Sequence, residues 1–270
     1  MKLLVAGVRE ILPGSGIDCT EKAAELFVAA GAETEIGIDN IHMERYDALV
    51  VPGGLPDVDP AYWGEPNTDC KVIDPALDRK QMAIIKATVA QKKPIFGICR
   101  GMQLVSVFFG ATMIQDIESS EAHCYEPQAP KSHEAFSVPG TFAERLYGDS
   151  IVVNSAHHQA LRRIPHELRV AQMWCSNPRQ ANQALAAAAV GKLREGSGDC
   201  IVEAVCHESY PFIGTQWHPE CNGVWPGNKA DRHTKHHNGC NARSTYRFFQ
   251  HCCDNDNRHK ALYSADLHCS

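Results

Sequence analysis

The pentapeptide Gly97-Ile98-Cys99-Arg100-Gly101 has the form of a cysteine held on a sharp turn between a strand and a helix. Glycines two positions before and after Cys99 remove the side chains that such a turn would bring into collision. The following helix directs its N-terminus at the sulfur, and its dipole is expected to stabilise a thiolate. The backbone N–H of Arg100 is then positioned to stabilise an oxyanion. On this pentapeptide alone, a nucleophile and a buried structural cysteine are equally good interpretations.

A thiol nucleophile requires a base, and the base requires a group that orients it. His218-Pro219-Glu220 follows the apolar segment 212–216, which predicts a strand. A histidine at a strand end can face the same crevice as Cys99, and Glu220 can reach back to its imidazole. Because the chain contains 14 histidines, this tripeptide alone is a weak signal and is more simply explained as a solvated turn.

A pair of glycines ends another apolar run, at Pro52-Gly53-Gly54. Without side chains, the backbone of this segment can approach a ligand closely and offer a second oxyanion donor. Taken by themselves, these three residues are more simply explained as a turn.

The first two-thirds of the chain alternates between strand-like and helix-like segments. Strands are predicted at 2–8, 34–38, 47–51 and 94–98, and helices at 20–30, 74–91 and from Cys99 to Phe109, with Thr20 as the first N-cap. This alternation predicts an α/β fold with a mostly parallel sheet sandwiched by helices. Functional groups in such folds gather at the carboxyl ends of strands, where Gly54 and Cys99 are both placed.

The later part of the chain is richer in strands, which are predicted at 151–153, 168–174, 200–205 and 212–216. The Ala-rich stretch 180–193 predicts a helical insertion near residues 179–196. One domain is expected over residues 1–253, with a helix at 242–252, followed by a solvated Cys/His-containing tail at 254–270. The donors at His233, His236, His237 and Cys240 lack the spacing of common zinc motifs, so no metal site is predicted.

Composition limits the environment and the partners. The chain has 270 residues and a net charge of −6, which gives no reason to expect a nucleic acid or an anionic membrane as partner. The apolar run 3–8 is too short for a secretion signal, and no stretch approaches the length of a membrane span. A cytoplasmic location is therefore expected, with the 12 cysteines reduced.

Together, these motifs resemble the class I glutamine amidotransferase domains. Gly-Ile-Cys-Arg-Gly-Met-Gln at 97–103 is followed far downstream by Gln-Trp-His-Pro-Glu at 216–220. Finer matches resemble the γ-glutamyl-γ-aminobutyrate hydrolase branch, which belongs with the γ-glutamyl hydrolases. These matches lie at 52–65, 115–117, 153–159 and 202–204, so the resemblance covers about residues 45–220. It implies a flavodoxin-like fold with the cysteine on a nucleophile elbow.

The resemblance also implies roles for the matching residues. Cys99 would be the nucleophile, His218 the base and Glu220 its partner, and the backbone N–H groups of Gly54 and Arg100 would form the oxyanion hole. The glutamyl pocket would be lined by Gly53, Gln103, His158 and Gln159. A purely structural role for the histidine pair 157–158 is an equal alternative.

The chain departs from the usual pattern of the family at several positions. Ser106-Val107 and Gly110-Ala111 stand where Asn-Val and Gly-Gly are usual. The segment 75–80 stands where Asp-x-x-Arg-Asp is usual. None of these positions belongs to the implied triad, so they put the identity of the substrate in doubt rather than the thiol chemistry.

The implied reaction is hydrolysis of a γ-glutamyl amide through a glutamyl thioester, which releases glutamate and needs no metal or organic cofactor. One alternative is a glutaminase subunit that delivers ammonia to a separate synthetase chain. The other is a non-enzymatic regulatory protein on the same fold, against which the intact set of Cys99, His218 and Glu220 argues. The amine half of the small-molecule substrate and the oligomeric state, including a homodimer, are left open.

Overall fold

The computed structural model describes residues 1–124 and 131–221. The predicted helix at 242–252 and the predicted tail at 254–270 lie outside these residues. Within them, no helix is long and apolar enough to cross a bilayer.

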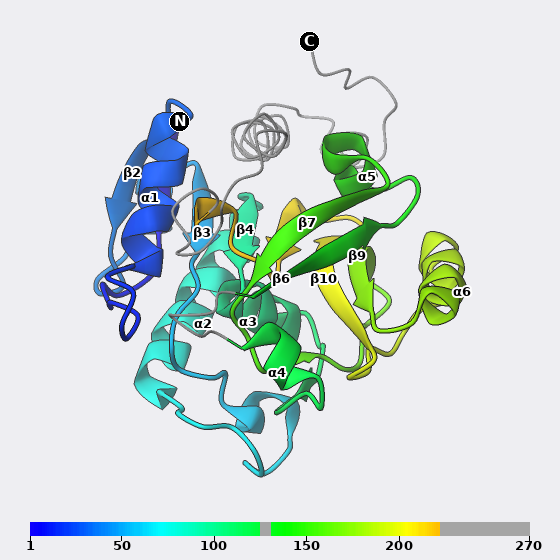
Figure 1. The fold of residues 1–270 in the computed structure, drawn as a ribbon. Coiled ribbons are helices and arrows are strands. Elements are labelled where there is room, and N and C mark those ends of the chain that lie inside the picture. Colours follow the sequence, from blue (N-terminus) through cyan, green and yellow to red (C-terminus); the bar gives the residue numbers. More distant parts are fainter. Residues whose placement is uncertain (125–130, 222–270) are drawn as a thin grey trace.

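A sheet with strand order β2-β1-β3-β4-β11-β10-β9-β6-β7 runs through the described residues (Figure 1). One half consists of parallel strands: β2 (Glu33–Ile36), β1 (Lys2–Val5), β3 (Ala48–Val51), β4 (Ile95–Ile98) and β11 (Phe212–Thr215). The other half continues in antiparallel pairs: β10 (Cys200–His207), β9 (Leu168–Cys175), β6 (Lys131–Ser137) and β7 (Ser150–Ser155). The predicted α/β class is confirmed, and the antiparallel half extends it.

Helices cover both faces of the parallel half. On one face, α1 (Cys19–Ala29) packs Ala23 and Phe27 against Leu3 and Val50 of the sheet. On the other face lie α2 (Pro75–Ala90) and α3 (Arg100–Phe108), whose apolar side chains share a second cluster with Leu4, Leu49 and Val51. All four residues of β3 and of β4 are buried, because a parallel strand covered on both faces must be apolar throughout.

The helix starts have clear local causes. Asp74 caps α2 by accepting hydrogen bonds from the N–H groups of its first turn. The predicted N-cap of α1, Thr20, is wrong, because Asp18 occupies that position and accepts from the N–H of Glu21. The hydroxyl of Thr20 instead donates to the carbonyl of Val8 at 2.7 Å.

The shorter elements complete the chain. The Ala-rich stretch forms α6 (Pro178–Ala189), which packs against β9 on the side of the molecule away from α1 (Figure 1). The other helices are α4 (Ser120–His123), α5 (Phe142–Tyr147) and the short 3-10 turns η1 (Met43–Arg45), η2 (Pro60–Trp63) and η3 (Pro219–Cys221). The strands β5 (Met113–Ile114) and β8 (Ala160–Leu161) form a separate two-stranded sheet.

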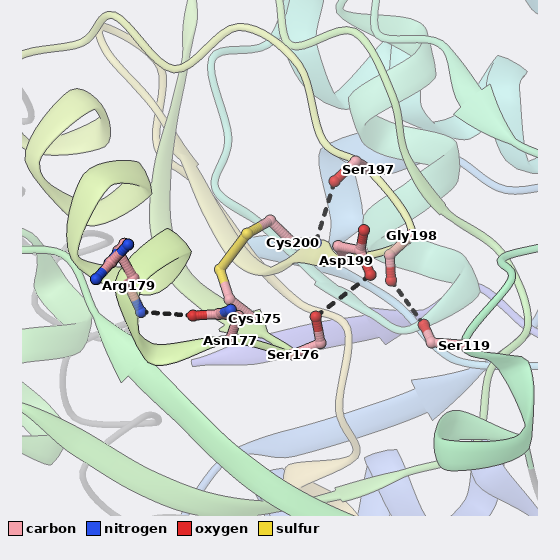
Figure 2. Close-up of a disulfide and its surroundings, with 9 residues drawn as sticks. All are labelled: Ser119, Cys175, Ser176, Asn177, Arg179, Ser197, Gly198, Asp199 and Cys200. Atoms are coloured by element: carbon pink, nitrogen blue, oxygen red, sulfur yellow. Dashed lines mark hydrogen bonds between the residues drawn. A yellow bond between two sulfur atoms is a disulfide. The ribbon is translucent and has the colours of Figure 1, made fainter.

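A disulfide joins Cys175 of β9 to Cys200 of β10 (Figure 2). The two residues are direct partners in the antiparallel ladder, with their Cα atoms 4.2 Å apart. The expectation that the cysteines are reduced is therefore wrong for this pair, because strand register places two distant cysteines side by side. Nearby hydrogen bonds from Ser176 to Asp199 and from Ser119 to Gly198 hold the same end of the ladder.

Candidate active site

Cys99 lies alone between the end of β4 and the first residue of α3. Its φ of 50° and ψ of −111° are unusual for a residue with a side chain, and such backbone angles cost about 1–3 kcal/mol. Hydrogen bonds hold this conformation: the N–H of Cys99 donates to Thr215 at 2.7 Å, and its carbonyl accepts from Gln103 at 3.1 Å. The turn therefore presents the sulfur at the carboxyl end of the parallel strands, as the sequence predicted.

Two glycines allow α3 to press against the sheet at this turn. A Cβ on Gly101 would lie 1.9 Å from the carbonyl oxygen of Val51, and a Cβ on Gly97 would lie 2.8 Å from the backbone of Met102. Neither position has room for any side chain. The position of the turn is thus set by contacts between main chains.

The imidazole of His218 lies against Cys99 and is oriented by Glu220. Its Nδ1 lies 2.7 Å from a carboxylate oxygen of Glu220, and both side chains are buried. Burial alone would lower the pKa of His218, but the charges of Glu220 and of the Cys99 sulfur outweigh it and raise the pKa well above its usual value. This environment favours the imidazolium form of His218.

The amide of Asn154 at the end of β7 holds the backbone of His218. Its Oδ1 accepts from the N–H of His218 and its Nδ2 donates to the carbonyl, both at 2.8 Å. Asn154, from the antiparallel half of the sheet, therefore holds His218 in place next to the parallel half. Asn154 belongs to the matched segment 153–159, but its contact with His218 joins positions 64 residues apart and leaves no local signal.

A second thiol, at Cys19, also contacts His218. A hydrogen bond from Cys221, together with a hydrogen bond and the charge of His218, lowers the pKa of Cys19 to about 6 against the opposing effect of burial. Cys19 opens α1 and lines the cavity next to Cys99. Nothing in the sequence around Cys19 distinguishes it from the other cysteines, because its neighbours in the chain form no motif.

The two implied oxyanion donors lie beside the sulfur. Gly54 and Arg100 line the same cavity as Cys99, and the N–H of neither donates to another of the described groups. Gly53 is placed differently, because a Cβ there would lie 2.7 Å from Cε1 of His218. Its lack of a side chain lets the imidazole approach the strand end.

The side chain of Arg100 points away from the cavity and into the protein beneath α2. Its guanidinium pairs with Asp78 and donates to Gln81, and all three side chains are buried. Burial raises the pKa of Asp78 and lowers that of Arg100, since both charged forms lose hydration. Burying the pair costs hydration free energy, and only the attraction between the two charges offsets that cost.

Replacing Asp78 by alanine is expected to lower the free energy of unfolding by about 3–5 kcal/mol, because the guanidinium of Arg100 is then buried without its partner. Urea denaturation measures the loss. The matched control is Asp39→Ala, which breaks an exposed pair with Lys80 of the same helix and should cost no more than about 1 kcal/mol. Equal losses of unfolding free energy in the two variants would contradict the conclusion that Asp78 compensates the buried charge of Arg100.

A cavity of about 300 Å³ opens above Cys99, at the small end of the range for small-ligand sites. The predicted residues Gln103, His158 and Gln159 all line it. The amide of Gln103 donates to the side chain of Gln216, which in turn donates to the sulfur of Cys99 at 3.5 Å. The structure therefore brings the predicted residues of the site together.

Two charged residues that the sequence did not single out also line this cavity, Asp57 and Lys71. Asp57 accepts from the ring of His158 at 2.8 Å and from the N–H of Lys71 at 2.7 Å. His158 and Asp57 therefore form a hydrogen-bonded pair in the cavity wall. His157 lines the cavity as well, and burial lowers its pKa to about 4, so its ring is neutral near pH 7.

Two groups of side chains in the described residues have a composition that could hold a metal ion: Cys19 with His218 and Glu220, and His123 with His157 and Glu203. The first shares its histidine and carboxylate with the Cys99 site. There, the 2.7 Å contact between His218 and Glu220 already uses a ring nitrogen and a carboxylate oxygen. This arrangement suits proton transfer to and from a thiol rather than metal binding.

The chain is similar in sequence to a protein family and to several characterised or named proteins. The family model described as peptidase C26 matches residues 14–177, a range that contains Cys99 and ends before His218. A glutamine amidotransferase-like protein of Lactococcus lactis, YvdE, is 33% identical over 196 residues, which cover 71% of this chain and 72% of that protein. The γ-glutamyl-γ-aminobutyrate hydrolase PuuD of Escherichia coli is 31% identical over 192 residues, covering 67% and 66% respectively.

Among solved structures, a glutamine amidotransferase from Thermotoga maritima superimposes with a TM-score of 0.60 at 13% identity, over 92% of this chain and 98% of that one. At this level of identity the likeness concerns the fold. It confirms the predicted flavodoxin-like architecture, in which helices flank the parallel strands.

Proposed function

Because this chain belongs to the peptidase C26 family and is a glutamine amidotransferase-like hydrolase, we propose that it cleaves the γ-glutamyl amide bond of a γ-glutamyl amine such as γ-glutamyl-γ-aminobutyrate. The observation that carries the proposal is the buried chain of Cys99, His218 and Glu220 at the base of a cavity of about 300 Å³. A nucleophile, a base and an orienting carboxylate are the groups that acyl transfer requires.

In the proposed reaction, the thiolate of Cys99 attacks the γ-carbonyl carbon of the substrate. The N–H groups of Gly54 and Arg100 stabilise the oxyanion that forms. The imidazolium of His218 gives its proton to the leaving amine, and the carbon–nitrogen bond breaks to leave a glutamyl thioester. Neutral His218 then takes a proton from water, which attacks the thioester and releases glutamate and the thiolate.

The lining of the cavity supports a glutamyl group as the acyl half. A γ-glutamyl compound carries an ammonium and a carboxylate on its α-carbon, so its site needs groups of both signs. Asp57 and Lys71 supply them at the cavity wall, and the amides of Gln103 and Gln159 supply neutral hydrogen-bonding groups. The amine half extends toward the cavity mouth.

A substrate panel with mass-spectrometric detection tests the proposal. Full-length protein is incubated with γ-glutamyl-γ-aminobutyrate, with other γ-glutamyl amines and with glutamine, and the release of glutamate is measured. We expect kcat/KM to be highest for a γ-glutamyl amine and the acid-quenched protein to carry one glutamyl group on Cys99. Absence of both turnover and adduct with every compound would overturn the proposal.

The same panel separates the alternative of a glutaminase subunit. That subunit would prefer glutamine over every γ-glutamyl amine and would release little ammonia until a synthetase chain is added. A γ-glutamyl amine turned over rapidly by the chain alone therefore excludes it.

A further inference from the structure

Four titratable side chains meet in the antiparallel half of the sheet, outside the Cys99 triad. Glu203 lies in β10, His133 in β6 and His123 at the end of α4, while His157 follows β7. Glu203 and His123 have no exposed surface, and His157 is 5% exposed. The ring of His123 lies 4.6 Å from that of His133 and 5.0 Å from that of His157, measured between centroids.

Hydrogen bonds define which ring nitrogens carry lone pairs. Nδ1 of His157 lies 2.9 Å from the carbonyl oxygen of Gln159, which can only accept, so Nδ1 carries the proton and Nε2 the lone pair. Nδ1 of His123 lies 3.1 Å from the hydroxyl of Ser155, which itself donates to the carbonyl of His123. Ser155 must then accept from Nδ1, so Nε2 of His123 also carries a lone pair.

These lone pairs face the carboxylate of Glu203, whose Oε1 also lies 3.0 Å from Nε2 of His133. Within the described residues, neither oxygen of Glu203 and neither Nε2, of His123 or of His157, has a hydrogen-bond partner. Nε2 of His157 lies 3.9 Å from Oε1 of Glu203. A buried anion that faces two lone pairs is unfavourable unless a cation lies between them.

We propose that His123, His157 and Glu203 bind a divalent transition-metal ion of the zinc class. One ligand atom from each residue lies within 4.8 Å of the other two. Two imidazole nitrogens and a carboxylate oxygen form a donor set that zinc commonly takes, at metal–ligand distances of about 2.0–2.2 Å. Small side-chain rotations close the three atoms onto a common centre.

The surroundings of the three ligands agree with this assignment. The hydrogen bonds from Nδ1 of His157 to Gln159 and from Nδ1 of His123 to Ser155 are the outer contacts that fix the ring orientation of metal-binding histidines. Nε2 of His133 lies 3.0 Å from Oε1 of Glu203, so His133 is placed to serve as the fourth ligand. The competing explanation is an ion pair between a protonated His133 and Glu203, without a metal.

The position of the site links it to the cavity above Cys99. His157 lines that cavity, which gives an ion a route to the buried donors. The next two residues, His158 and Gln159, form part of the cavity wall. A metal at this site therefore holds the wall in place from behind, as a structural ion rather than as a participant in the reaction at Cys99.

Cobalt titration of the full chain after chelator treatment tests the proposal, because Co²⁺ reports the type of its ligands. We expect one tightly bound Co²⁺ per chain with visible d–d bands and no thiolate-to-cobalt charge transfer, displaced by Zn²⁺. The absence of charge transfer separates this site from the cysteines elsewhere in the chain.

Three variants complete the experiment. Glu203→Gln and His123→Gln should each weaken this binding by at least about tenfold, whereas His42→Gln, at an exposed histidine, should leave it unchanged. Zn²⁺ should raise the Tm of the wild type and of His42→Gln, but not that of His123→Gln. Because this comparison of Tm values does not use Glu203→Gln, the test remains valid if that variant folds poorly. Cobalt bound only with charge-transfer bands, or equal binding by His123→Gln and His42→Gln, would overturn the proposal in favour of the ion pair.

Discussion

Replacing Cys99 by alanine is expected to lower kcat/KM for γ-glutamyl amide hydrolysis by about 10⁴- to 10⁶-fold, because it removes the thiol that forms the thioester in the proposed reaction. Cys19 also contacts His218 and lines the cavity, but it begins α1 and not α3, the helix whose first residue is the proposed oxyanion donor Arg100. Alanine keeps the Cβ of the residue it replaces, so the substitution should leave the fold intact and the backbone conformation at φ 50° unchanged. Steady-state release of glutamate measures the effect.

The matched control is Cys206→Ala. Cys206 is a buried cysteine of β10 outside the disulfide, so its loss tests whether removing a buried thiol affects activity through the fold. This variant should retain kcat/KM within a few-fold. Substantial turnover by Cys99→Ala, with the glutamyl group found on Cys19, would contradict the prediction and show that Cys19 is the nucleophile.

Replacing Glu220 by glutamine is expected to lower kcat by roughly 10²- to 10⁴-fold and to change its pH dependence. The carboxylate is among the groups that raise the pKa of His218, so its removal lowers that pKa. The imidazolium that protonates the leaving amine is then lost at a lower pH. The alkaline limb of the kcat profile should therefore move to lower pH in the variant.

The pH–rate profile of both proteins provides the measurement, and Glu208→Gln provides the control. Glu208 is an exposed residue just after β10, on a different segment from the triad. Its replacement should leave both the rate and the alkaline limb unchanged. A Glu220→Gln profile that falls in height without moving would mean that the carboxylate orients the ring but does not set its pKa.

Much of the parallel half of the fold could be predicted from the sequence. Buried strands such as β3 and β4 are uninterrupted apolar runs, and the glycines around Cys99 mark a sharp turn whatever lies around them. The strand β6 was not predicted, because it begins with four consecutive polar residues, Lys131–Glu134, and so lacks the apolar alternation that indicates a strand. The disulfide between Cys175 and Cys200 was not predicted either, because it depends on the register between β9 and β10, which the sequence does not show.

The supporting contacts of the site were harder to predict than the triad candidates. Asp78 lies in the segment 75–80, which was read as a departure with no bearing on the triad, yet it pairs with the residue next to Cys99. Asn154 and His218 are joined by two hydrogen bonds across 64 positions. Each of these side chains is unremarkable in its own segment, and only the folded chain shows which partner it meets.

The close approach of Gly101 to the carbonyl of Val51 limits which substitutions this part of the chain can accept during evolution. A Cβ there would lie 1.9 Å from that oxygen, so substitution is blocked by backbone rather than by any neighbour that could mutate in compensation. Side chains farther along the helix have no such restriction, and Ser106 and Ala111 stand there without disturbing the turn. Mutational tolerance should therefore fall steeply over the few residues that lead to Cys99. A lineage can lose most of its resemblance elsewhere while this turn persists.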